Sequence, residues 1–183
     1  MRVILTKRLL REGLLSLLKD KPLSRISITD LCAASGINRA TFYNHYDSVP
    51  MILRDIVREY AEQIEKIYMS EIRTGHSDET ALEACLAYLQ GKKNEISVLF
   101  CGNAENYISG FGLEIINDFI TRNRNGLRKQ IGCSDDEIYL YLIMTASGAY
   151  GLIVTWLTND MKQTPAEITA IIRRLFEIRS WKI

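Results

Sequence analysis

The chain has 183 residues, of which 47% are hydrophobic and 25% charged. This composition excludes a disordered or fibrous chain, and the length suits one domain or two small ones. The net charge of +1 is unevenly spread, because residues 1–50 carry eight Lys and Arg against four Asp and Glu, whereas residues 51–183 carry fifteen against eighteen. A basic first part on a mildly acidic remainder indicates that only the first part meets a polyanion.

The cysteines and the N-terminal segment indicate the compartment. Four scattered cysteines form no CxxC pair and have no histidine at metal-ligand spacing, so the sequence predicts neither a metal site nor a cofactor. They suit buried thiols in a reducing cytosol, and a redox-sensing thiol is the alternative. The segment MRVILTKRLL carries charges through its apolar stretch and has no small-residue cleavage site. The sequence therefore predicts a cytoplasmic protein without a signal peptide.

Capping signals divide the first 50 residues into short helices. Ser27 and Asp30 have the spacing of a capping box, and Gly36 stands where a left-handed backbone would end the helix that the box opens. Asn38 is a good cap for the helix that follows. Together with leucines at helical spacing near the N-terminus, these signals predict helices over residues 6–20, 27–36 and 39–46.

The remainder of the chain is also predicted to be helical. Pro50 suits the first turn of a long helix, and capping boxes begin at Ser134 and Thr164. The predicted helices cover residues 50–72, 78–90, 94–101, 108–130, 135–159 and 165–179. Because no alternating strand and no repeat is found, we expect an all-α protein with two parts: a domain of short helices in residues 1–50, and a second helical domain in residues 51–183.

The segment Ile138–Leu157 is twenty residues long and carries no charge. That length could span a bilayer, but the segment holds several Ser, Thr and Gly residues and has no flank rich in Lys and Arg. We therefore expect no membrane contact and interpret it as a helix covered by the core and by a second subunit, with small residues that let the partner helix approach. The predicted dimer interface consists of Tyr141, Thr145, Gly148, Ala149, Leu152, Trp156, Ile168, Ile172 and Leu175.

Residues 27–46, SITDLCAASGINRATFYNHY, have the layout of a helix-turn-helix. Arg39 lies in the first turn of the second helix, the part that faces base edges, and its guanidinium can bind guanine O6 and N7. Ala40 is small enough to contact a thymine methyl group. Thr41, Tyr43 and His45 carry donors suited to phosphate oxygens. This stretch therefore predicts binding to double-stranded DNA.

The stretch INRATFYNHY, residues 37–46, resembles the third helix of the tetracycline-repressor (TetR) family of transcriptional regulators, and residues 27–36 resemble its second helix. The resemblance implies a homodimeric repressor with a palindromic operator, and C-terminal helices for dimerisation and often for a ligand. By position it assigns phosphate contacts to Ser27, Tyr43 and His45, base edges to Thr29, Arg39 and Ala40, and either role to Thr41. Asn38 completes the predicted DNA-binding set.

One position departs from the family pattern. Family members usually carry a phosphate-binding lysine where this chain has Val49, and a basic residue is common where it has Asp47. Each lost phosphate contact should flatten the salt dependence of binding by about 0.9 unit of log-log slope. The departure keeps open a helical protein-interaction or co-regulator protein that no longer binds DNA by itself.

Catalysis is not expected. The chain has two histidines, His45 and His76, and lacks an H-E-x-x-H motif, a nucleophile elbow and a phosphate-binding glycine loop. The C-terminal region is rich in Tyr, Phe and Trp, which could line a pocket for a small apolar effector. The same residues would serve equally well as a core and a dimer seam, so both interpretations stay open, as does control by protein contact.

Overall fold

A computed structural model of the chain describes residues 2–100, 104, 107–108, 110–111, 114, 121 and 134–177. Among these residues every regular element is a helix and no strand occurs, which confirms the predicted all-α class. Most of the predicted helix over residues 108–130 lies outside the described residues.

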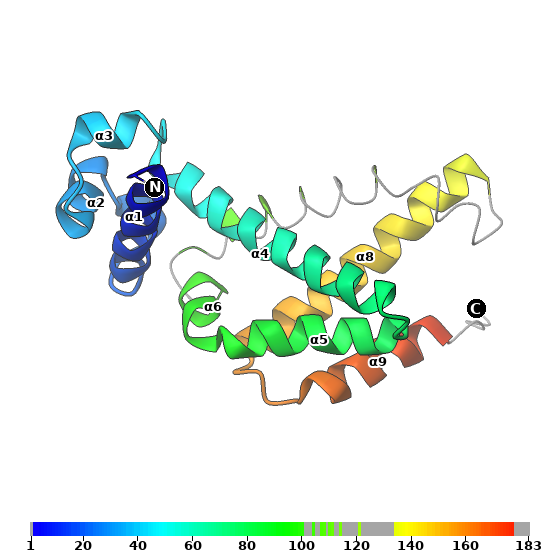
Figure 1. Cartoon of the computed structure of the whole chain (residues 1–183). Coiled ribbons are helices and arrows are strands. Elements are labelled where there is room, and N and C mark those ends of the chain that lie inside the picture. Colours follow the sequence, from blue (N-terminus) through cyan, green and yellow to red (C-terminus); the bar gives the residue numbers. More distant parts are fainter. Residues whose placement is uncertain are drawn as a thin grey trace.

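Helices α1 (Arg2–Leu18), α2 (Ile28–Ser35) and α3 (Arg39–Tyr43), with a 3-10 turn at Leu23–Arg25, group at one end of the molecule (Figure 1). We call them the head. Leu10, Leu14, Leu31 and Phe42 are fully buried in its core. The first two helices pack closely at Gly13, where a Cβ atom would lie 3.1 Å from the Cβ of Ser35, so a larger residue would force them apart.

The predicted capping signals of the head are confirmed. The Ser27 hydroxyl accepts a hydrogen bond from the Asp30 amide at 3.1 Å, and the Asp30 carboxylate accepts one from the Ser27 amide at 3.0 Å. Gly36 ends α2 in the left-handed conformation with φ of 67°. The Asn38 side chain accepts a hydrogen bond from the Thr41 amide at 2.7 Å and opens α3.

Two head helices differ in length from the prediction. The first begins at Arg2 and ends at Leu18, earlier than predicted at both ends. The third is a single turn that ends at Tyr43, because the following residues tighten into a turn in which the His45 amide donates to the Phe42 carbonyl at 2.9 Å.

We call the helices from α4 to α9 the body. Helix α4 (Val49–Arg73) leaves the head and lies alongside α5 (Asp78–Gly91) (Figure 1). Helix α9 (Pro165–Glu177) also packs on α5, whereas α6 (Lys93–Phe100) contacts both α8 (Asp135–Thr158) and α1. The capping boxes at Ser134 and Thr164 are both present, as predicted. One hydrophobic cluster runs from the head through α4, α5 and α6 to α9.

Candidate DNA-binding surface

Helix α3 presents some of its side chains to solvent and anchors others in the core. Arg39 and Ala40 are exposed, Tyr43 is 50% exposed and Thr41 is half-buried, whereas Phe42 is fully buried. Within the described part of the chain, Arg39 makes no hydrogen bond or ion pair. The helix thus presents a guanidinium and a phenol to solvent from a single turn that the buried Phe42 anchors in the core.

Aromatic contacts and the cap hold this turn in place. The ring of Phe42 lies 5.4 Å from that of Tyr43 in an edge-to-face arrangement, and 6.4 Å from that of Tyr46. Since the cap occupies the side-chain oxygen of Asn38, its amide NH₂ group is the part left to donate to a phosphate. His45 is half-buried just after the helix ends.

The N-terminus of α2 is held by a small polar network. The Ser27 hydroxyl donates to the Asp30 carboxylate at 2.8 Å, and Lys21 pairs with the same oxygen at 2.9 Å. Hydrogen bonds from Lys21 and Ser27 lower the pKa of Asp30 to about 2. A phosphate contact from the Ser27 hydroxyl would compete with this cap. Thr29 is exposed in the same turn and has no partner among the described residues.

A second network, which the sequence analysis did not predict, joins the head to α4. Asp55 accepts hydrogen bonds from Lys7 at 2.8 Å and from the Tyr46 hydroxyl at 2.9 Å, and the Lys7 ammonium lies 5.3 Å from the centre of the Tyr46 ring. Burial would raise the pKa of Asp55, but the hydrogen bonds from Lys7 and Tyr46 outweigh it and hold the pKa below its usual value. Lys7 is therefore a structural cation, and no local pattern predicts its partner 48 residues away.

The two residues that depart from the family pattern lie in different environments. Val49 is 4% exposed and belongs to the hydrophobic core at the start of α4. Asp47 is exposed two residues earlier and places a negative charge close to α3. Both features lower the positive potential beside the candidate surface.

Much of helix α8 is left uncovered by its own chain. The segment Glu137–Thr158 is long and apolar enough to cross a membrane by length and composition, and 12% of its apolar window is buried within the chain. Leu140 and Met144 are each 66% exposed, and Ser147, Gly148, Gly151 and Thr155 continue the exposed stripe at helical spacing. The stripe therefore leaves apolar area of α8 exposed to solvent.

The predicted dimer-interface residues fall into three groups. Gly148 is exposed, and Ala149 and Leu152 are half-buried, so they retain area for a partner. In contrast, Trp156, Ile168 and Ile172 are at most 5% exposed and belong to the core of the single chain. Their side chains pack α8 and α9 against the rest of the chain, so little of their surface is left for contact with a second subunit. The side chains of Tyr141, Thr145 and Leu175 lie outside the described part of the structure.

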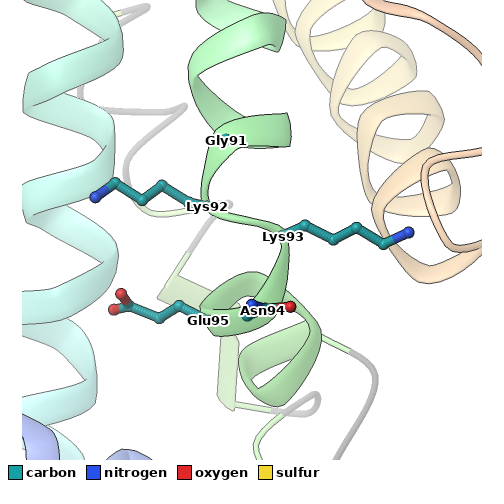
Figure 2. A pocket seen from close by; sticks show the side chains of 5 residues that line it. All are labelled: Gly91, Lys92, Lys93, Asn94 and Glu95. Carbon is teal, nitrogen blue, oxygen red and sulfur yellow. The ribbon is translucent and has the colours of Figure 1, made fainter.

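A shallow depression of about 210 Å³ lies at the junction of α5 and α6, lined by residues 91–95 (Figure 2). Four of its five lining residues carry polar side chains, and Lys93 and Glu95 point to opposite sides. No cluster of His, Cys, Asp and Glu that could hold a metal occurs among the described residues. Burial raises the pKa of the Cys85 thiol to about 11, so this thiol is protonated and unreactive at neutral pH.

Comparison with known protein families assigns most of the body to a family of transcriptional regulators. Residues 78–177 match the family model TetR_C_8, which is described as the transcriptional regulator C-terminal region. No curated protein matches the chain. The family match covers more than half of the chain and lies outside the helix-turn-helix motif, so the two parts of the sequence point independently to one family. The chain belongs to the TetR family of transcriptional regulators.

Proposed function

We propose that this regulator is a cytoplasmic homodimeric repressor that binds a palindromic operator by placing α3 of each subunit in the major groove. The observation that carries the proposal is the exposed set of Arg39, Ala40 and Tyr43 on a turn anchored by Phe42. This set lies in the basic part of the chain, which suits contact with a nucleic acid.

The side chains divide by the chemistry of their contacts. Arg39 donates two hydrogen bonds to a guanine, Ala40 contacts a thymine methyl group, and Thr29 reaches a base edge from α2. The remaining donors bind phosphate and set the register of the head on the duplex. They are Asn38, Thr41, Tyr43 and His45, with Ser27 contributing only if its hydroxyl leaves Asp30.

The exposed stripe of α8 supports the dimer. Gly148 and Gly151 lie on it and let a second helix approach closely, while Leu140 and Met144 supply apolar area that a partner subunit would bury. A two-fold dimer would place two copies of α3 in successive major grooves, about 34 Å or a small multiple of one turn apart. Such a geometry requires an operator with two-fold symmetry.

Release by a small apolar effector completes the proposal. An effector bound between the C-terminal helices would change the separation of the heads through α4 and lower the population that fits the operator. The proposal of a pocket is supported by the aromatic residues of the body, which could line an apolar site. The depression at residues 91–95 does not support an apolar pocket, because it is polar and its volume of about 210 Å³ is below the range of about 300–1,000 Å³ that is typical of sites for small molecules.

A pull-down of fragmented source DNA with purified protein tests the proposal. We expect recovery of one palindrome well above background, with both half-sites protected. Recovery of nothing above background at low salt would contradict it. In that event the buried Val49 and exposed Asp47 favour the second candidate, a regulator that acts through protein contacts without binding DNA itself.

A further inference from the structure

An ionic junction connects the head to the body at a site separate from the chain connection into α4. Arg11 of α1 donates from its Nε to the Glu95 carboxylate of α6 at 3.0 Å, and its two terminal nitrogens bind Glu95 and Glu59 of α4. The side chains of Arg11 and Glu95 are 26% and 25% exposed. One guanidinium therefore joins three helices at a half-buried site.

The surroundings of Arg11 favour a single arrangement. The guanidinium lies 5.7 Å from the centre of the Tyr60 ring, which in turn lies 6.2 Å from the ring of Tyr88. Burial alone would lower the pKa of Arg11, but the carboxylates of Glu95 and Glu59 raise it. Because a guanidinium is planar and directional, both carboxylates and the ring restrain its position.

The first turn of α6 is also fixed on its other side. Lys93 and Glu95 point in opposite directions from this turn (Figure 2). The Lys93 ammonium binds the side chain of Asp160 at 2.6 Å and its carbonyl at 3.0 Å. Asp160 lies in the turn between α8 and α9, where it and the buried Met161 have positive φ of 61° and 49°. The first turn of α6 thus bridges the α8–α9 turn and the head.

We propose that Arg11 is a positioning residue that fixes the angle of the head relative to α8 and α9, and so sets the half-site spacing that the dimer accepts. This inference rests on the proposed function. The Lys7–Asp55 pair ties the head to the start of α4 only, so a bend of α4 beyond Asp55 would carry the head with it. Contact with α6 opposes that bend. Without Arg11, Glu59 and Glu95 lose their shared cation and repel each other.

Arg8 provides a matched control on the same helix. It is exposed and pairs with Glu12 of α1 itself at 3.7 Å, so its removal costs the same charge without cutting a link between helices. The test compares Arg11→Gln and Arg8→Gln with the wild-type protein. The probe is the palindromic duplex that wild-type protein enriches from a randomised library, with versions lengthened at the centre by one base pair and by about five, half a helical turn.

We expect the wild-type protein to discriminate strongly against the lengthened duplexes. Arg11→Gln should lower this discrimination about fivefold or more, the usual size of a coupling between sites, and Arg8→Gln should leave it unchanged. Glu95→Gln should change the discrimination in the same direction as Arg11→Gln, and the double variant should lose no more than Arg11→Gln alone, because Arg11→Gln already removes the contact with Glu95. Equal weakening on every spacing would overturn the inference.

A measurement without DNA separates this inference from the proposed function. Spin labels on non-canonical amino acids at the exposed positions Ala33 in α2 and Glu83 in α5 report the distance between head and body, in samples diluted with unlabelled protein. Arg11→Gln should broaden the distance distribution, and Arg8→Gln should not. If the wild-type protein binds no duplex but the distribution broadens, the proposed function fails and the junction stands. If the distribution is unchanged, the inference fails whatever the DNA result.

Discussion

Some charged and polar side chains of the head pair with other residues of the chain, whereas others are exposed on the candidate DNA-binding surface. Lys7 pairs with Asp55 of α4, and Lys21 pairs with Asp30 at the start of α2, so these charges are already balanced within the protein. Arg39 and Tyr43 have exposed polar groups on a turn that the core keeps in place. We therefore expect the predicted DNA-binding residues to contribute unequally to DNA affinity, with the largest contributions from those whose hydrogen-bond donors are unoccupied.

Arg39→Ala should weaken operator binding by about 1–3 kcal/mol and relax base preference at one position in each half-site, because it removes a two-hydrogen-bond contact to one base. Affinities for the operator and for duplexes substituted at single positions measure both effects. Arg73→Ala, an exposed change at the far end of α4, controls for the loss of charge. Equal weakening by Arg39→Ala on all sequences would contradict base contact.

Tyr43→Phe should weaken binding to all duplexes alike, because a phosphate contact carries no sequence information. The ring that packs on Phe42 remains, so the melting temperature should stay unchanged. Binding to the operator and to an unrelated duplex of equal length measures the effect. Loss on the operator alone would show that the hydroxyl contacts a base.

At the scale of helices, the acid stability of the head should depend on the capping box of α2. The folded-state pKa of Asp30, about 2, lies below its ordinary 3.8. Ionised Asp30 therefore stabilises the fold above about pH 4, and this contribution is lost as the pH falls toward 2.

Thermal melting of the wild-type protein and of Asp30→Asn, followed from neutral pH down to about pH 2, measures this contribution. The variant should melt lower than the wild-type protein near neutral pH, and the gap should close in acid. A gap of constant size would mean that the carboxylate charge adds nothing to the cap.

Local signals predicted most helix boundaries but not the links between helices. The caps at Ser27, Asn38 and Ser134 act within a few residues, so sequence spacing reveals them. The bond between Arg11 and Glu95 spans 84 residues and follows from packing, which no local pattern carries. In the uncharged segment Ile138–Leu157 of α8, apolar residues occur on every side, so periodicity could not show that Trp156 faces the chain's own core.

For the whole molecule, the exposed stripe of α8 supports the proposed dimer. Met144→Glu should shift the protein from dimer to monomer, because the dimer would have to bury an unpaired carboxylate at a cost of several kcal/mol. The helix itself should persist, since Met144 is 66% exposed in the single chain. Sedimentation equilibrium measures the shift, with Ala87→Glu, an exposed change on α5, as control. Unchanged dimerisation of Met144→Glu would place the interface elsewhere.

If two copies of α3 bind two half-sites of one operator, a salt titration with intact and scrambled half-sites should show it. Affinity is measured against salt concentration for the recovered palindrome, for the same duplex with one half-site scrambled, and for a fully scrambled duplex. We expect log affinity to fall steeply with log salt on all three duplexes, and each scrambled half-site to lower the affinity by a large and similar factor. Equal affinity for the three duplexes at every salt concentration would contradict binding to two half-sites.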